Sequence, residues 1–317
     1  MKKSYQRKTI LLVIGYWLLV IGLCGCQNKQ LHKDSRVMMG TYVEVISPDK
    51  EAADIVFNEI KRVEGLLSKY KEDSEISRLN RLGELRVSQE TFYILEKAKE
   101  FWQVSDGAFD VTIGPLVDLW GFTDKKFSFP EKEKIEDALA KVGFEKIILH
   151  PDDNVVKFKL YGMRLDLGAV AKGYAVDCAV RKLRACGIKS CLINAGGQIY
   201  CLGDNSGRPW KVAIQDPRSP GFKEYLELHD QAVATSGDYE QYFMHQGERY
   251  AHILNPKTGY PADSGVVCVT VIAPDGLTAD ALATSIFVLG KDKGLKLAQR
   301  FNQVIVEVTE EKDVPHN

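Results

Sequence analysis

The stretch Thr278-Ala279-Asp280-Ala281-Leu282-Ala283-Thr284-Ser285, near the C-terminus, says most about both the structure and the chemistry of this chain. It predicts the start of a helix, in which Asp280 and Thr284 lie on one face, one turn apart. A carboxylate and a hydroxyl so placed are hard oxygen ligands, which suit Mg²⁺ shared with a substrate phosphate. An alternative needs no metal: Thr278 caps the helix, and Asp280 lies in the first turn and favours the dipole.

The segments around this helix predict one α+β domain over residues 36–310. Short apolar segments joined by tight turns dominate residues 190–272. Consecutive strands joined in this way favour antiparallel pairing, so we expect a mixed, largely antiparallel sheet flanked by helices. The other expected elements are helices at 56–67, 135–142, 169–185, 279–289 and 293–301, a helix capped by Ser88, and a strand at 163–165.

The N-terminus has the features of an export signal. Lysine and arginine residues within 2–8 precede an uncharged, mostly apolar run over 9–23. The following Leu23-Cys24-Gly25-Cys26 resembles a bacterial lipobox, which predicts removal of residues 1–25 and lipidation of Cys26. An uncleaved membrane anchor is the alternative, because the uncharged run is at the low edge of a spanning length.

Both interpretations place the domain outside the cytoplasm at a membrane surface, and the first makes it lipid-anchored through a polar tether over residues 26–35. The chain has 42 basic and 43 acidic residues and no compact basic run, so we expect no nucleic-acid partner. Beyond the export signal there is no CxxC pair, which argues against a zinc site. We favour buried thiols over disulfides for the cysteines of the domain, which are Cys178, Cys186, Cys191, Cys201 and Cys268.

The segment Asp166-Leu167-Gly168-Ala169-Val170-Ala171-Lys172-Gly173-Tyr174 lies where a strand is expected to give way to a helix. Free N–H groups and the helix dipole make such a junction an anion site. Lys172 could then contact a phosphate, and Asp166 could accept a hydrogen bond from a base or sugar. Equally, Asp166 could be a helix cap and Lys172 a solvated charge.

Three further segments could contribute to a site. Asn194-Ala195-Gly196-Gly197 suits a tight turn or a backbone cradle for phosphate. His252 begins an ordered loop that ends at Pro261, and it is either a general base or a strand histidine bonded to backbone. In Gly107–Pro115, Phe109 could cover a flat ring and Asp110 could bond its edge, although core packing explains Phe109 equally well.

Together these segments resemble the ApbE family of bacterial FAD:protein FMN transferases over residues 36 to 308. The resemblance rests on many weak motifs that occur in the family's order. They are Met39-Gly40-Thr41, Ser68-x-Tyr70, Ser74 to Asn80, Gly107 to Pro115, Leu119 to Phe122, Asp166 to Tyr174, Asn194 to Gly197, Pro209-Trp210-x-Val212, Ala234 to Asp238, His252 to Pro261 and Ala279 to Thr284.

The resemblance implies a Mg²⁺-dependent transfer of FMN from FAD, the substrate, to a Thr or Ser hydroxyl of an acceptor protein, with release of AMP. It implies that Asp280, Thr284 and the main-chain oxygen of Ala169 hold Mg²⁺. It implies that His252 deprotonates the acceptor hydroxyl. The implied FAD contacts are Met39, Tyr70, Ala108, Phe109, Asp110, Asp166, Lys172 and Leu254.

The implied acceptor is a subunit of a membrane or extracytoplasmic redox complex. Two positions depart from the pattern of many relatives: Asn255 stands where they have Asp, and Gln198 where they have Asp or Glu. Two other functions stay open, namely a Mg²⁺-dependent FAD pyrophosphatase and a non-catalytic flavin-binding lipoprotein.

Overall fold

A seven-stranded antiparallel sheet forms the centre of the computed structural model, which describes residues 30–313. Its order is β1-β2-β6-β7-β10-β13-β14. These strands are β1 (His32–Met38), β2 (Thr41–Ser47), β6 (Cys191–Ala195), β7 (Gln198–Leu202), β10 (Gln231–Gly237), β13 (Val266–Ala273) and β14 (Ile305–Glu310). The expected α+β class with a largely antiparallel sheet is confirmed.

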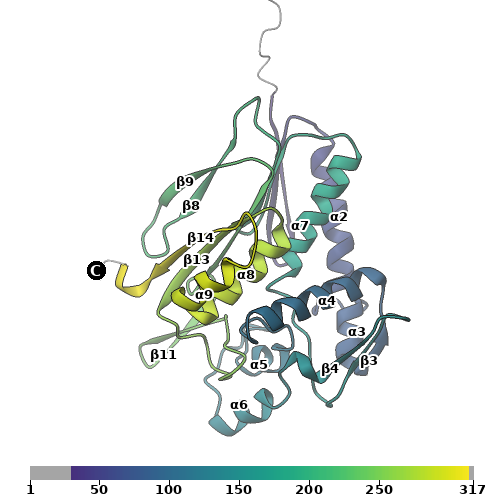
Figure 1. Ribbon diagram of the computed structural model, residues 1–317, viewed down its shortest axis with the longest axis vertical. Coiled ribbons are helices and arrows are strands. Elements are labelled where there is room, and N and C mark those ends of the chain that lie inside the picture. The colour runs from purple at the N-terminus through teal and green to yellow at the C-terminus, as the bar shows by residue number, and fades with distance from the viewer. Residues whose placement is uncertain (1–29, 314–317) are drawn as a thin grey trace, which may run out of the picture.

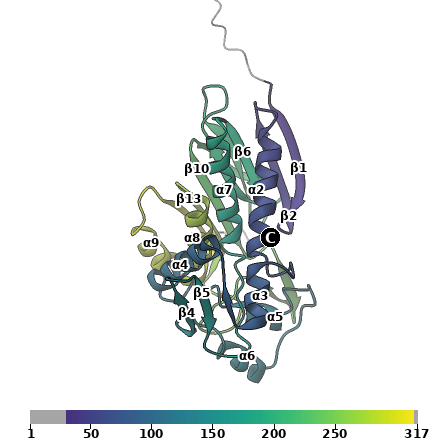
Figure 2. The ribbon, with the colours of Figure 1, turned by 90° about the vertical axis from the view of Figure 1, so that its right-hand side faces the viewer.

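Helices cover one face of this sheet and enclose the main core. Figures 1 and 2 show α2 and α7 running side by side along the sheet, with α8 next to them. The helices are α2 (Ala52–Leu67), α7 (Ala171–Ala185), α8 (Gly276–Leu289) and α9 (Lys291–Ala298). Helix α2 presents Val56, Ile60 and Val63 to the core at helical spacing, and each is fully buried.

A hairpin covers part of the opposite face of the sheet. Strands β8 (Trp210–Gln215) and β9 (Phe222–Leu228) form it, and Figure 1 shows it alongside β13 and β14. Trp210 and Leu228 of the hairpin pack with Leu192 and Ile272 of the sheet in a second apolar cluster. Because helices and hairpin cover both faces, all residues of β13 are buried, which explains why its sequence is apolar except for Thr270.

The lower part of the molecule in Figure 1 contains the long helix α4, several short helices, a three-stranded sheet of order β3-β5-β4 and the separate hairpin β11–β12. The elements are α3 (Glu75–Leu82), β3 (Glu84–Arg86), α4 (Gln89–Val104), α5 (Gly114–Leu119), α6 (Lys132–Leu139), η1 (Phe144–Lys146), β4 (Ile147–His150), β5 (Val155–Phe158), β11 (Tyr242–His245) and β12 (Glu248–Ala251), with η2 (Glu311–Asp313) at the end of the chain.

Aromatic rings join the β11–β12 hairpin to the loop between α5 and α6. Trp120 stacks on Tyr250 with ring centroids 5.9 Å apart, and Phe127 stacks on Phe243 at 5.6 Å. The Trp120 indole N–H also donates to the Gly259 carbonyl at 2.9 Å. These contacts fix the hairpin and the loop that follows it, although neither belongs to the main sheet.

Three local expectations can be compared with the structure. Ser88 does cap α4, because its side chain accepts from the Thr91 N–H. The strand expected at 163–165 is wrong: that segment makes only an isolated bridge between Ile113 and Arg164. The predicted tether over residues 26–35 is too long, because residues 32–35 already pair with β2 as part of β1.

The export signal over residues 1–25 and the lipidation site Cys26 lie outside the described residues. Within residues 30–313, no helix is long and apolar enough to cross a bilayer. The cysteines of the described domain are free thiols. Four are buried as expected, but Cys186, at the C-terminal end of α7, is exposed.

Candidate functional site

A close crossing of α7 and α8 forms one end of the candidate site. A Cβ added to Gly173 would overlap the Gly276 carbonyl, and one added to Gly276 would lie 2.6 Å from the Gly173 oxygen. Asp177 of α7 reinforces the crossing, because its carboxylate accepts from the Gly276 and Leu277 N–H groups at 2.6 and 2.9 Å. Glycines at both contact points therefore let the first turns of the two helices touch.

This crossing places Asp280 beside the first turn of α7. The Asp280 side chain is 7% exposed, and its Oδ2 accepts from the Gly173 N–H at 3.1 Å. Burial raises the pKa of the Asp280 carboxyl, while the neighbouring Lys172 and the Gly173 N–H act in the opposite direction. A buried carboxylate with a single hydrogen bond retains free lone pairs for a cation.

The capping explanation of Asp280 is wrong. The N-cap of α8 is Asp275, which accepts from both the N–H and the hydroxyl of Thr278. Because the helix begins at Gly276, Asp280 lies beyond the first turn, where the favourable interaction with the dipole has faded. The capping role that the sequence predicted for Thr278 belongs to Asp275, three positions earlier.

The two other expected metal ligands lie close to the crossing. Thr284 is one turn beyond Asp280 on α8, and its hydroxyl is 3.4 Å from the Ser236 hydroxyl of β10. Ala169 is partly exposed in the turn that leads into α7. The described residues contain no cluster of three or more His, Cys, Asp or Glu side chains able to hold a metal. A cation here would depend on hydroxyl, carbonyl and phosphate oxygens around one carboxylate, a donor set that suits Mg²⁺.

Lys172 lies at the centre of the site, because its charge acts on three acidic or imidazole groups. Its charge lowers the pKa values of all three groups. For Asp280 and Glu240 this opposes the effect of burial, whereas for His252 it adds to the effect of burial. Glu240 is exposed; partial desolvation of its carboxyl raises its pKa, and Lys172 opposes the rise. A cation next to these groups is suited to binding a phosphate.

The imidazole of His252 is held from one side by the main chain. Its Nδ1 lies 3.2 Å from the Gln241 carbonyl, which also accepts from the His252 N–H at 2.9 Å. A carbonyl can only accept, so Nδ1 carries the proton and Nε2 is left as a base. Desolvation lowers the pKa of His252 to about 4; the Gln241 carbonyl and Asp166 oppose this shift and Lys172 adds to it.

At the other end of the site, a hydrogen bond and an ion pair hold the Asp166 carboxylate in place. Its Oδ1 accepts from the Gly168 N–H at 2.8 Å, and its Oδ2 lies 2.8 Å from the Lys69 Nζ. It does not cap α7, whose N-cap residue is Val170. Tyr70 lies next to this ion pair and is 67% exposed, and Lys69 Nζ is 5.2 Å from its ring centroid.

The expected flavin contacts in the loop after α4 make mostly internal contacts. The Phe109 ring is 1% exposed and packs against Phe101, so core packing accounts for it and its side chain does not form a cover for a flat ring. Ala108 is likewise buried. Asp110 accepts from the N–H and hydroxyl of Thr112 and from the Phe144 N–H. Burial raises the pKa of Asp110 to about 6.

The remaining two expected flavin contacts lie in different surroundings. Met39 has a positive φ of 49°, and its N–H donates to the Glu64 carboxylate at 2.9 Å. Leu254 is 5% exposed and packs with Leu116 and Trp120 in the aromatic cluster. Met39 is therefore partly accessible from outside, whereas Leu254 supports the loop from within.

The two departures from the family pattern have different structural roles. Asn255 Oδ1 accepts from the Lys257 N–H at 2.9 Å, so the side chain closes its own turn and does not orient His252. Gln198 is 2% exposed, and its Nε2 lies 3.4 Å from the Gly276 oxygen. Its Oε1 is the single buried side-chain polar atom without a hydrogen bond within the described residues.

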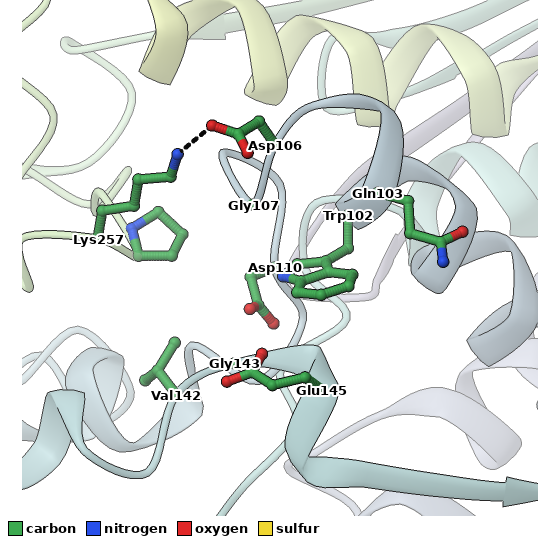
Figure 3. A pocket seen from close by; sticks show the side chains of 10 residues that line it. Trp102, Gln103, Asp106, Gly107, Asp110, Val142, Gly143, Glu145 and Lys257 are labelled. Carbon is green, nitrogen blue, oxygen red and sulfur yellow. Dashed lines mark hydrogen bonds and ion pairs between the residues drawn. The ribbon is translucent and has the colours of Figure 1, made fainter.

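A pocket of about 430 Å³ lies between the loop after α4 and the loop after His252. Figure 3 shows Asp106 and Lys257 joined by an ion pair of 2.5 Å, with Trp102 and Asp110 beneath it. Of the expected site residues, only Asp110 lines this pocket. The pocket therefore does not include His252 or Asp280.

Sequence analysis missed Lys69 and Glu240. Lys69 stands inside the quoted motif Ser68-x-Tyr70, and Glu240 lies two residues beyond the quoted Ala234 to Asp238. No spacing pattern marks either residue, because the groups that each one interacts with are far away in the sequence: Asp166 for Lys69, and Lys172 and Asp280 for Glu240.

Comparisons with known proteins find similar sequences and structures over most of the chain. The sequence model of the ApbE family matches residues 39–307. The chain is 37% identical to the FAD:protein FMN transferase of Haemophilus influenzae, with 90% of this chain and 89% of the relative covered. It is 34% identical to the enzyme of the same name from Vibrio cholerae, with 92% of each covered.

Two solved structures are similar over nearly the whole chain. The ApbE protein of Thermotoga maritima has a TM-score of 0.83 and 34% identity, and the match covers 89% of this chain and 95% of that one. The flavin transferase ApbE of Vibrio cholerae has a TM-score of 0.80 and 32% identity, with 90% and 94% covered.

Proposed function

The chain belongs to the ApbE family, and on that premise we propose that it transfers FMN from FAD to a Thr or Ser hydroxyl of an acceptor protein. The observation that carries the proposal is the row of groups Asp166, His252, Lys172 and Asp280, which the α7–α8 crossing and the β11–β12 hairpin assemble. It combines a base, a phosphate-binding cation and a buried carboxylate at one site.

The proposed reaction breaks the phosphoanhydride bond of FAD and forms a phosphoester bond to the acceptor. The acceptor oxygen forms a bond to the phosphorus of the FMN moiety, and the P–O bond that joins it to the AMP moiety breaks. The hydroxyl proton passes to His252 Nε2, and AMP leaves with the electron pair of the broken bond. The product is a phosphoester between FMN and the acceptor.

His252 is suited to this proton transfer because its tautomer is fixed. The Gln241 carbonyl orients the ring, and desolvation keeps the imidazole neutral at physiological pH. A positioned base of this kind contributes roughly 10²–10⁴-fold to a rate. Lys172 would meanwhile bind the pyrophosphate and hold the reacting phosphorus near the base.

Asp280, Thr284 and the Ala169 carbonyl would hold Mg²⁺. When bound, the ion would supply charge neutralisation at the pyrophosphate. The surroundings fit this role, because the Asp280 carboxylate is buried with one hydrogen bond and the Thr284 hydroxyl faces the same part of the site from the next turn.

We propose in addition that the protein works outside the cytoplasm, held to the membrane by a lipid on Cys26. The export features within residues 1–25 and the lipobox-like end support this. A lipid anchor would restrict the enzyme to acceptors at the same membrane surface, so a subunit of a membrane or extracytoplasmic redox complex is the expected partner.

Mass spectrometry tests the reaction. The purified protein is incubated with FAD, Mg²⁺ and a candidate flavin-acceptor protein. Transfer predicts an acceptor mass increased by FMN less water, equimolar AMP, and loss of both in EDTA. Free FMN and AMP with every tested acceptor unmodified would support the pyrophosphatase, because water is then the nucleophile. Bound but intact FAD would support a non-catalytic flavin-binding protein.

A further inference from the structure

The pocket beside the loop after α4 has no part in the proposed reaction. Its volume of about 430 Å³ lies within the range of roughly 300–1,000 Å³ that is typical of ligand clefts. Gln103, Asp106 and Glu145 are exposed at its rim, whereas Trp102 and Asp110 line it more deeply (Figure 3). The lining contains none of the residues proposed to bind phosphate or Mg²⁺ or to take the acceptor proton. The pocket is therefore a separate candidate site.

The buried carboxylate of this pocket, Asp110, has no counter-charge. It is 8% exposed, and the groups that donate to it are neutral: the N–H and hydroxyl of Thr112 and the Phe144 N–H. Burial raises the pKa of Asp110 to about 6, and the nearby charge of Glu145 acts in the same direction. Buried carboxylates are normally paired with a cation, so a positive group that enters the pocket would complete this one.

Glu145 adds a second carboxylate without a close cation. Lys146 Nζ is 3.8 Å away, beyond hydrogen-bond distance, and it donates instead to two main-chain carbonyls. Asp106 differs, because it is paired with Lys257 at 2.5 Å, and Lys293 acts on it from outside the lining. The carboxylates open to a cationic ligand are therefore those of Asp110 and Glu145.

Two further features favour an organic cation. The Trp102 indole lines the pocket and is held against Phe144, with ring centroids 6.2 Å apart, and an indole face attracts cations. Helix α4 ends beside it with no basic residue in its last turn, so the negative end of the helix dipole is uncompensated. Residues 30–313 contain no cluster of three His, Cys, Asp or Glu side chains for a metal. A guanidinium group fits best, because it stacks on aromatic rings and pairs with carboxylates.

The position of the pocket indicates which partner carries this cation. Pro256 and Lys257 form one wall, and they belong to the loop that begins at His252. The ion pair between Lys257 and Asp106 ties this loop to the end of α4. The acceptor protein has to approach the same loop to give its hydroxyl proton to His252. The phosphates of FAD, in contrast, would be repelled by the carboxylates of the pocket.

We propose that this pocket is an exosite for an arginine side chain of the acceptor protein, with Trp102 against the guanidinium face and Asp110 and Glu145 as its counter-charges. The inference rests on the proposed transfer to a protein acceptor. It places part of acceptor recognition outside the reacting centre. Changes in the pocket should therefore alter binding of the acceptor and leave the chemistry on FAD unchanged.

Binding of a small probe tests the pocket itself. The full-length protein is titrated with N-acetyl-argininamide and with N-acetyl-citrullinamide, which has a similar shape and no charge. The signal is the indole N–H resonance of Trp102, identified by its absence in Trp102→Phe. The variant is Glu145→Gln, and the matched control is Glu136→Gln. These two carboxylates are 55% and 64% exposed, each has a lysine at 3.8 or 3.7 Å, and Glu136 does not line the pocket.

We expect the arginine probe to bind at least about fivefold more tightly than the citrulline probe. Glu145→Gln should reduce this preference to below about twofold, and Glu136→Gln should retain it. Asp106→Asn is a second variant, because asparagine tolerates the positive φ of 54° at this position and the change frees Lys257 to compete for the pocket. It should weaken the arginine probe as well. Equal binding of the two probes by the unaltered protein would overturn the inference.

Transfer kinetics test the role of the pocket with an acceptor that mass spectrometry has shown to be modified. Glu145→Gln should raise KM for the acceptor about fivefold and change kcat and KM for FAD by less than about twofold. N-acetyl-argininamide should compete with the acceptor and not with FAD. A variant that loses FAD affinity would assign the pocket to the flavin and overturn the inference.

The outcomes separate this inference from the proposed function. If the unaltered protein modifies its acceptor and Glu145→Gln has the same acceptor KM as Glu136→Gln, the exosite is disproved and the transferase stands. If the unaltered protein cleaves FAD and modifies no acceptor, the proposed transfer fails, and the exosite for an acceptor fails with it. Circular dichroism of each variant shows that a change in KM is not caused by unfolding.

Discussion

The two ends of the site are built in different ways. The phosphate end, formed by Gly173, Lys172 and Asp280, rests on two helices whose backbones touch. The expected flavin end, with Tyr70 and Asp166, lies on loops, and the Lys69–Asp166 ion pair joins the two segments. A packed helix crossing tolerates little displacement, whereas loop residues can change without unfolding the domain. Substitutions at the first end should therefore affect turnover and stability, and substitutions at the second end mainly affinity.

The largest effect is expected at the phosphate end from Asp280→Ala. Loss of the buried carboxylate should lower AMP release by at least about 10³-fold, because the proposed Mg²⁺ site keeps no charged protein ligand. Release of AMP from FAD is measured at saturating Mg²⁺, with circular dichroism to check the fold. Asp54→Ala is the control, since that side chain is 71% exposed. Full activity in Asp280→Ala would remove the metal assignment.

His252→Ala should slow transfer by about 10²–10⁴-fold and leave FAD affinity nearly unchanged. The reason is that His252 is assigned to proton transfer and the flavin contacts lie elsewhere. Single-turnover rates and FAD titrations separate the two effects, with the exposed His229→Ala as control. A variant that no longer binds FAD would make His252 a binding residue instead.

The pH profile gives a second measurement of the same group. Desolvation lowers the pKa of His252 to about 4 from an ordinary value near 6.5, so the neutral base persists well below neutral pH. We expect kcat/KM to stay level from pH 8 down to about 5 and to fall only near pH 4. An acid limb centred near 6.5 would contradict the buried, neutral imidazole.

Gly173→Ala should destabilise the domain by about 1–3 kcal/mol, because the added methyl group would overlap the Gly276 carbonyl and force α7 and α8 apart. The matched control is Gly65→Ala in α2, where an added Cβ meets nothing within 4 Å. That variant should gain about 0.5–1 kcal/mol from lower backbone entropy in the unfolded state. Urea unfolding of both proteins measures the contrast, and equal stabilities would show that the crossing can relax.

The smallest effect is expected from Asn255→Asp. The carboxylate retains the oxygen that accepts from the Lys257 N–H, so the turn should persist and activity should change by less than about twofold. Initial rates of AMP release at several FAD concentrations test this. A large gain would show that a charge at this position acts on His252 or on the metal.

Sequence patterns predicted the elements of the main sheet better than the contacts of the site. Strands and helices such as β13 and α2 follow from periodicity, because their burial repeats along the chain. The first residue of α8 was missed because Asp275 and Thr278 both favour helix starts, and only the structure shows which one caps. The first part of β1, residues 32–35, was assigned to the tether because it lies at the edge of the sheet with polar residues exposed on both faces.

Side-chain partners were beyond the reach of local patterns. The Lys69–Asp166 ion pair joins residues 97 positions apart, and their proximity depends on how α2 meets the turn before α7. The departure at Asn255 could not be interpreted from the sequence either, because a sequence does not reveal that its side chain closes a local turn. Sequence motifs thus identify candidate site residues, whereas three-dimensional packing decides which side chains they contact.

The order of the central sheet also has a kinetic consequence. Strand β2 lies next to β6, and β7 next to β10, so long loops must close before most of the sheet can form. Such non-local pairing makes folding slow. The site has the same dependence, since Lys69 lies in the first quarter of the chain and Asp280 in the last. A growing or truncated chain that lacks α8 lacks Asp280 and Thr284, so the proposed centre can assemble only after most of the chain has been made.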